Sequence, residues 1–326
     1  MTPAPPRVSI ILPTYNGEGL LPGALASIRD QTYADWEAIV VDDGSDDDTA
    51  AVAEAFAASD PERVTVVRLE HNVGVGGART EGIARSRGGE LLCLLDQDDL
   101  WDERYLECSV AAYDEAVAQG RPVAIISSNA RIMGEDGLTD ETWWGRNGWV
   151  TPVRLENMLR RNYLNARSLF TRQAYERVGG DFARGLGGSD DLDLWLRILE
   201  QGYEAIGVRE PLAIYRDHAG SFSRHRLAMS EGKIACLRRA LDRGHLGPRE
   251  RRIARAQIRH WRALREAELC RRAVAARRPA GVLGHGARAV PLGAIAFAQD
   301  PARWREWGAR VAARVSGAAG RRRRTR

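Results

Sequence analysis

The sequence contains only four cysteines, Cys93, Cys108, Cys236 and Cys270. They form no CxxC pair and no other spacing typical of metal ligands. Two of them lie within apolar patterns that indicate burial. This use of cysteine fits a reduced, cytoplasmic setting.

Long apolar runs are also missing. The nearest candidate for a membrane span is interrupted by Arg288 and flanked by glycine and proline. Residues 1–6 lack the basic stretch and apolar run of a signal peptide. We therefore expect a protein that is cytoplasmic, either soluble or peripheral at the inner face of the plasma membrane.

The composition is that of a globular protein, with 44% apolar and 28% charged residues in a chain of 326. The net charge of +4 conceals a strong asymmetry. Residues 226–326 carry 26 basic against 7 acidic side chains, whereas residues 1–225 carry 22 against 37. An acidic front and a basic end predict different roles for the two parts.

The front part alternates short apolar runs with helical patterns, which predicts an α/β fold with a mainly parallel sheet. We expect strands at 8–12, 36–41, 64–69, 91–95 and 123–127, and helices near 20–31, 47–58, 77–87, 152–161 and 192–201. In such sheets ligands bind beyond the carboxyl ends of the strands. Three of these ends carry polar residues, at 13–16, 42–45 and 96–99.

The most informative segment is Leu91–Asp99, where an apolar strand runs directly into three carboxylates. Because side chains alternate along a strand, Asp96 and Asp98 are expected on the same side. Mg²⁺ and Mn²⁺ are usually held by one or two carboxylates together with substrate phosphates. The segment therefore predicts a metal site for a phosphorylated substrate, with an acidic turn as the alternative.

A sugar linked to a nucleoside diphosphate would suit these strand ends. Tyr15 can stack on a base, while Asp42 or Asp43 can accept hydrogen bonds from a base or ribose. Arg79 follows a glycine-rich turn and could reach a phosphate. The acceptor hydroxyl needs a general base, and Asp191, at a helix start beside a glycine loop, is the candidate.

Five segments of the sequence together resemble the family 2 glycosyltransferases of the GT-A fold. They are Val8–Asn16, Asp42–Ser45, Asn72–Arg79, Leu95–Asp99 and Asp190–Arg197. They occur in the family's order, and the likeness spans about residues 7–225.

The resemblance implies a Rossmann-like α/β/α sandwich and an inverting, single-displacement reaction. It assigns base and ribose contacts to Tyr15 and Asp43, supported by Asp42. Pro13, Arg79, Asp96 and Gln97 are also expected among the nucleotide contacts. Asp96 and Asp98 would form the DxD motif that holds Mn²⁺ or Mg²⁺, with His218 as a further metal ligand. Asp191 falls where the family has its catalytic base.

Two departures from the family pattern matter. The usual Glu-Asp pair is Asp190-Asp191 here, which shortens the first side chain without removing the base. The QxxRW signature of processive synthases is missing, as are membrane helices. We therefore expect transfer of a single sugar rather than polymerisation. The resemblance implies a UDP- or dTDP-sugar as the donor and a glycan or lipid-linked acceptor, in cell-surface glycan or glycolipid biosynthesis.

We expect three regions: a catalytic domain at 1–225, a basic helical region at 226–320 and a disordered tail at 321–326. The basic region could contact anionic membrane lipid, or simply pack on the catalytic domain. Binding to a specific nucleic acid is not expected, because no aromatic-interleaved recognition motif accompanies the arginines. A sugar nucleotidyltransferase is the alternative enzyme, although the first strand lacks the glycine-rich basic loop it normally needs.

The tryptophans Trp143, Trp144 and Trp149 leave two interpretations open. They could form a platform on which an acceptor sugar stacks, or they could pack their own loop. Packing is the simpler expectation.

Overall fold

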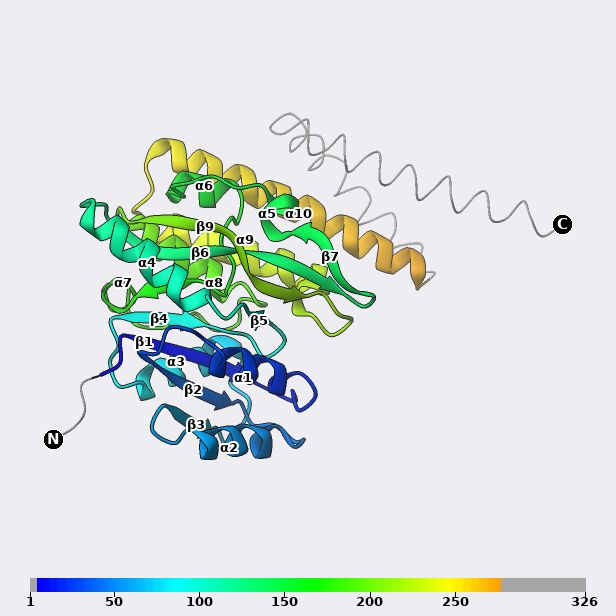
Figure 1. The fold of residues 1–326 in the computed structure, drawn as a ribbon. Coiled ribbons are helices and arrows are strands. Elements are labelled where there is room, and N and C mark those ends of the chain that lie inside the picture. Colours follow the sequence, from blue (N-terminus) through cyan, green and yellow to red (C-terminus); the bar gives the residue numbers. More distant parts are fainter. Residues whose placement is uncertain (1–4, 277–326) are drawn as a thin grey trace.

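The computed structural model describes residues 5–276. Within this range the chain forms one curved nine-stranded sheet with helices on both faces (Figure 1). The expected tail at 321–326 and the end of the 226–320 region lie outside the described residues.

The strands are β1 (Val8–Thr14), β2 (Trp36–Asp42), β3 (Val64–Arg68), β4 (Leu91–Leu94), β5 (Leu100–Trp101), β6 (Val123–Gly134), β7 (Gly137–Thr142), β8 (Leu169–Thr171) and β9 (Glu204–Arg216). Their order in the sheet is β3-β2-β1-β4-β8-β6-β9-β5, with β7 paired to β6. The first four are parallel, whereas β8 runs antiparallel to both β4 and β6. The expected α/β fold is confirmed, with a mixed sheet.

The helices are α1 (Leu21–Arg29), α2 (Thr49–Ser59), α3 (Val75–Arg85), α4 (Tyr105–Ala118), α5 (Trp143–Asn147), α6 (Leu155–Arg160), α7 (Arg172–Arg177), α8 (Asp190–Glu200), α9 (Arg226–Asp242) and α10 (Pro248–Ala275). A short 3₁₀ turn covers Phe222–Arg224.

Because successive side chains of the central strands point to opposite faces of the sheet, two apolar cores form, one on each face. In β1, Ile11 belongs to the core beneath α3 and α8, while Ile10 and Leu12 belong to the core beneath α1 and α4. Both cores are fully buried here, which explains why these strands read as continuous apolar runs. The result is the three-layer sandwich expected from the sequence.

The register of β1 and β2 brings their polar ends together. Thr14 lies opposite Asp42, and the amide of Asp43 donates to the carbonyl of Thr14 at 2.8 Å. Parallel pairing of β1 with β4 then places the residues after Leu94 at the same edge. The three strand ends therefore meet, as the pattern predicted.

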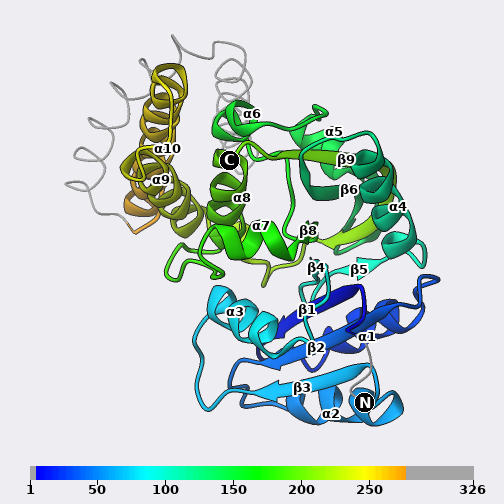
Figure 2. The same cartoon turned by 90° about the vertical axis from the view of Figure 1, so that its left-hand side faces the viewer.

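The basic helices pack against the rest of the molecule. α9 contacts α8, and α10 contacts both α9 and α6 (Figure 2). Ile234, Leu237, Ile253 and Ile258 belong to the same core as Trp195 of α8. As far as residue 276, the basic region is thus joined to the catalytic unit through apolar contacts.

Two expected segments differ in detail. The strand expected at 123–127 continues to Gly134 as β6, and the tryptophan loop contains β7 and the short helix α5. Among residues 5–276, no helix is both long enough and apolar enough to cross a bilayer.

Candidate active site

The ends of β1 and β2 hold the residues expected to contact a nucleotide. Tyr15 is 42% exposed, whereas Pro13, Asp42 and Asp43 are buried. Gln97 reaches across from the end of β4, where its Oε1 accepts from the Tyr15 amide at 2.8 Å and its Nε2 donates to the Tyr15 carbonyl. Gln97 therefore fixes the backbone that carries the exposed aromatic ring.

The two carboxylates after β2 organise nearby backbone. Asp43 accepts from the amides of Val73 and Gly74 at 2.7 and 2.9 Å, while Asp42 accepts from the amide of Ser45 at 3.1 Å. Burial raises the pKa of Asp43, and the two amide hydrogen bonds oppose that rise. Asp43 thus holds the backbone of residues 73 and 74 at the strand ends, while Asp42 fixes the turn that follows β2.

Arg79 of α3 lies between two carboxylates that are distant in sequence. Its guanidinium bonds Asp96 at 2.5 Å and Asp190 at 2.6 Å, and its side chain is only 4% exposed. The charges of Asp96 and Asp190 raise its pKa against the effect of burial. Arg79 was expected to reach a phosphate, and the structure shows it bridging the end of β4 to the start of α8.

Asp98 and His218 lie together. His218 Nε2 is 3.1 Å from Asp98 Oδ2, although 120 residues separate them. Burial, followed by the charge of Asp96, raises the pKa of Asp98, while His218 lowers it. The pairing brings together two of the three residues expected at the metal.

The donor set suits a divalent cation that also binds substrate phosphates. A carboxylate and an imidazole are both common ligands for Mn²⁺, and Mg²⁺ usually takes only one or two carboxylates. Within residues 5–276, however, no group of three or more acidic, histidine or cysteine side chains is arranged as a complete metal site. Asp96, the other expected ligand, is engaged by Arg79.

Asp99 is a residue of this site whose role the sequence did not reveal. It is 1% exposed, forms an ion pair with Arg167 and accepts from the Arg216 amide at 3.2 Å. Burial raises the pKa of Asp99 to about 7. Its partners come from distant segments, so no local signal could have identified them.

Asp191 lies in the first turn of α8. Its Oδ1 accepts from the Leu192 amide at 2.7 Å. Burial, followed by the charge of Asp190, raises the pKa of Asp191 to about 7, against the opposing effect of Arg79. A carboxylate with this pKa is suited to general base chemistry near neutral pH.

A cavity of about 260 Å³ joins these residues to the basic helices. Asp96, Asp98, Asp99 and Asp191 line one part of it. The other part is lined by α6, the loop that follows it, and the helices α9 and α10. The expected base and two of the expected metal ligands, Asp96 and Asp98, therefore face a common space.

The tryptophans have different roles. Trp144 and Trp149 stack on each other with ring centroids 3.7 Å apart, and Trp144 is buried. Trp143 instead lines the cavity and contacts Tyr215 edge to face at 5.5 Å. Packing is confirmed for Trp144 and Trp149. Of these three tryptophans, Trp143 is the one that lines the cavity.

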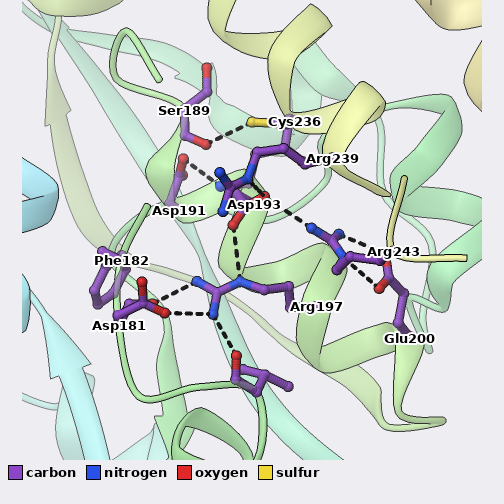
Figure 3. Close-up of polar contacts among 12 residues, drawn as sticks. Asp181, Phe182, Ser189, Asp191, Asp193, Arg197, Glu200, Cys236, Arg239 and Arg243 are labelled. Carbon is purple, nitrogen blue, oxygen red and sulfur yellow. Dashed lines mark hydrogen bonds and ion pairs between the residues drawn. The ribbon is translucent and has the colours of Figure 1, made fainter. Parts of the chain in front are cut away.

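A buried ion cluster anchors the helix that carries Asp191 (Figure 3). Asp193 is fully buried and contacts Arg197 at 2.9 Å, Arg239 at 3.1 Å and Arg243 at 3.3 Å. Arg239 belongs to α9 and Arg243 directly follows it, so the cluster ties the end of α9 to the start of α8. Figure 3 also shows Cys236 of α9 against the Ser189 carbonyl, a contact of 3.2 Å.

The fold and the acidic strand ends are those of a GT-A type glycosyltransferase. Residues 9–179, more than half of the chain, match the model of "Glycosyl transferase family 2". The chain is 30% identical over 216 residues to TuaG of Bacillus subtilis (strain 168), a protein named for teichuronic acid biosynthesis; the match covers 66% of this chain and 81% of TuaG. The chain therefore belongs to glycosyl transferase family 2, and it is a glycosyltransferase.

Two solved structures share the fold. One is S. aureus TarS 1–349 in complex with UDP-GlcNAc, with a TM-score of 0.62 and 17% identity over 90% of this chain and 81% of that one. The other is the mannosyltransferase PcManGT from Pyrobaculum calidifontis in complex with GDP-Man and Mn²⁺, with a TM-score of 0.59 and 22% identity over 91% and 86%.

Proposed function

We propose that this glycosyltransferase is inverting and transfers one sugar from a nucleoside-diphosphate sugar to an acceptor hydroxyl in cell-surface polysaccharide synthesis. The observation that carries the proposal is the shared cavity. Asp191, with a pKa raised to about 7, faces the same space as Asp96 and Asp98. Asp191 can accept the proton of the acceptor hydroxyl, while Asp96 and Asp98 lie where a metal ion beside them can stabilise the leaving diphosphate.

Asp191 is the proposed base. It would take the proton from the acceptor hydroxyl, which then attacks the anomeric carbon from the face opposite the nucleotide. An α-linked donor would give a β-linked product. The short bond from the Leu192 amide to Asp191 fixes the carboxylate, leaving its second oxygen for the acceptor.

Asp98 and His218 are proposed to hold Mn²⁺ or Mg²⁺, with Asp96 close by. Such an ion would supply positive charge to the departing diphosphate. The Mn²⁺ complex of the mannosyltransferase neighbour supports this use of metal. Besides any contact with the nucleotide, Arg79 is proposed to position Asp96 and the start of α8.

The nucleotide is proposed to lie over the ends of β1 and β2. Tyr15 would stack on the base, Asp42 and Asp43 would face the base and ribose, and Pro13 and Gln97 would shape the contact. UDP- or dTDP-sugars are the proposed donors. The UDP-GlcNAc complex of the TarS neighbour supports this, whereas the GDP-Man complex shows that related folds take other bases.

A glycan or a lipid-linked glycan is the proposed acceptor, at the cytoplasmic face of the plasma membrane. The basic region 226–326 is proposed to contact anionic lipid there. Sedimentation with vesicles tests this contact: we expect salt-sensitive binding to phosphatidylserine vesicles and none to phosphatidylcholine vesicles. Equal binding to both would contradict it.

The reaction is tested with purified protein, Mn²⁺ and a panel of nucleotide sugars, by following nucleotide release and product linkage. Asp191→Asn should lower kcat by about 10²- to 10⁴-fold, the usual contribution of a general base, and leave UDP binding intact. Asp98→Ala should weaken the Mn²⁺-dependent binding of UDP. The exposed Asp242→Asn serves as a control for loss of one carboxylate.

Full activity in both Asp191→Asn and Asp98→Ala would overturn the proposed site. A product with retained anomeric configuration would overturn the inverting mechanism. Release of pyrophosphate from a nucleoside triphosphate would instead indicate a sugar nucleotidyltransferase.

A further inference from the structure

Lys233 is the only lysine in the 326-residue sequence, in which the other 47 of the 48 basic residues are arginine. It lies in α9 and lines the active-site cavity. A chain that uses arginine everywhere else has an ammonium group at this one position. Lysine differs from arginine in presenting a compact charge with three donors on a flexible stem.

The surroundings of Lys233 hold its charge in the cavity. Its Nζ lies 4.2 Å from the ring centroid of Trp261, which belongs to α10 and also lines the cavity. A cation over an aromatic face is stabilised in its charged form. Neighbouring cavity residues from the same helices are Met229, Leu237 and Gln257.

More positive charge lies on the same side of the cavity. Arg161, directly after α6, lines it as well, and so does Arg160, which also pairs with Glu156 at 2.9 Å. The carboxylates Asp96, Asp98 and Asp191 line the part at the strand ends and the start of α8. The cavity is therefore acidic where the reaction is proposed and basic toward the helices α6 and α9.

The basic side of the cavity lies away from the residues proposed to hold the base and ribose. Tyr15, Asp42 and Asp43, proposed to hold the nucleotide, do not line this cavity. Asp191 does, and it must reach the acceptor hydroxyl. An acceptor placed against Asp191 therefore extends toward Lys233.

We propose that Lys233 binds an anionic group of the acceptor, with Trp261 holding the ammonium in place and Arg160 and Arg161 adding to the field. This inference rests on the proposed function and names the acceptor class: a glycan that carries a phosphate or a carboxylate near its reacting sugar. A lone ammonium suits phosphate well. Neutral glycans lack the group that Lys233 would bind.

Binding of small anionic probes tests the proposal without knowledge of the natural sugar. Decyl diphosphate, decyl glucuronide and the uncharged decyl glucoside are titrated calorimetrically into the full chain saturated with UDP and Mn²⁺. We expect at least one anionic probe to bind tenfold or more tightly than the glucoside. The preferred probe distinguishes a phosphate from a carboxylate.

Two variants of α9 provide the matched comparison. Lys233→Met should raise the Kd of the preferred anionic probe at least tenfold, because a charged hydrogen bond is lost. Arg238→Met removes the same charge from an exposed position of the same helix and should change that Kd less than twofold. The Kd of UDP should stay within twofold in both variants.

Chemical labelling of the unaltered chain provides a second measurement. The ε-amine of Lys233 is the only lysine amine available to N-hydroxysuccinimidyl acetate, and the α-amino group is an internal reference. The preferred anionic probe should slow acetylation of Lys233 at least fivefold, whereas UDP alone and decyl glucoside should not.

Three outcomes would overturn the proposal. They are equal binding of charged and uncharged probes, an unchanged anionic-probe Kd in Lys233→Met, and weakened UDP binding in that variant. The last would assign Lys233 to the donor. None of these results affects the test of Asp191 and Asp98, so the failure of the acceptor proposal and that of the proposed function remain distinguishable.

Discussion

Asp191 illustrates how one carboxylate acquires the properties of a base from its surroundings. It begins a helix, where the backbone favours negative charge, yet it is packed close to Asp190 and only partly exposed to solvent. Burial and the neighbouring charge together outweigh the influence of Arg79 and raise its pKa to about 7. The proton affinity of the group is therefore suited to neutral pH.

The pH dependence of the reaction follows from this shift. Only deprotonated Asp191 can accept the acceptor's proton, so kcat/KM should fall as pH decreases through about 7. Because one proton is involved, we expect a loss of about tenfold per pH unit on the acid side. A profile of kcat/KM between pH 5 and pH 9 measures this decrease on the acid side directly.

Asp99 provides the control for this profile, since burial raises its pKa to about 7 as well. In Asp99→Asn, kcat/KM should still fall as pH decreases through about 7. In Asp191→Asn, the residual activity should no longer show this decrease. If this decrease in kcat/KM disappears in Asp99→Asn but not in Asp191→Asn, the titrating group is Asp99, which would contradict the role of Asp191.

Residue types at the site were more predictable than residue partners. The carboxylates of the strand ends and Asp191 stood out in the sequence because they follow apolar runs or begin a helix. Arg79, expected at a phosphate, contacts Asp96 and Asp190, and the latter lies 111 residues away. Asp99 was not singled out, because its partner Arg167 lies 68 residues away. Contacts of this kind depend on the tertiary fold.

At the scale of elements, α8 is held by charge as well as by apolar packing. Asp193 is 0% exposed and forms ion pairs with Arg197 of its own helix, with Arg239 of α9 and with Arg243, which follows α9. Arg243 also pairs with Glu200 at 2.7 Å near the other end of α8. The basic side chains at the end of α9 thus have a structural role, because Arg239 and the following Arg243 neutralise buried acids of α8.

Removal of this buried charge should loosen α9 from α8. We expect Asp193→Asn to lower the free energy of unfolding by about 3 kcal/mol, since arginines packed around it lose their counter-charge. The value lies at the lower end for buried pairs because Arg239 is half-exposed. Urea unfolding measures the change.

Asp242→Asn, on the exposed face of α9, is the matched control and should change the free energy of unfolding by less than about 0.5 kcal/mol. A similarly small change in Asp193→Asn would show that the cluster does not stabilise the contact between the helices.

Elements with strong periodicity or long apolar runs were predicted well from the sequence. The strands at 8–12, 36–41, 64–69 and 91–95 agree with β1 to β4 within two residues at each end. The helix α4 and the strands β5, β7, β8 and β9 were not predicted from the sequence. The strand β8 has only three residues and is inserted between β4 and β6, so it leaves no period to detect. Its pairing is specified by its neighbours rather than by its own sequence.

At the scale of the whole molecule, the acidic front and the basic end share one apolar core. Leu237 and Cys236 of α9 and Ile253 of α10 belong to the cluster that includes Trp195 and Phe170. The boundary expected at 225 reflects a change of charge, which is a property of the surface. Burial, which decides whether two segments fold together, crosses that boundary.

This shared core predicts a single unfolding transition for the described part of the chain. Leu237 is 4% exposed, so Leu237→Ala should lower the free energy of unfolding by about 2–5 kcal/mol through lost contacts and a residual cavity. Because α9 and the sheet are packed in one cluster, the transition should move to lower temperature as a whole. Differential scanning calorimetry and near-UV circular dichroism of the sheet-side tryptophans should report the same midpoint.

If Leu237→Ala instead separates an early helical transition from an unshifted transition of the sheet, the helices are an independent unit, and the cavity wall that carries Lys233 can open without unfolding the catalytic domain.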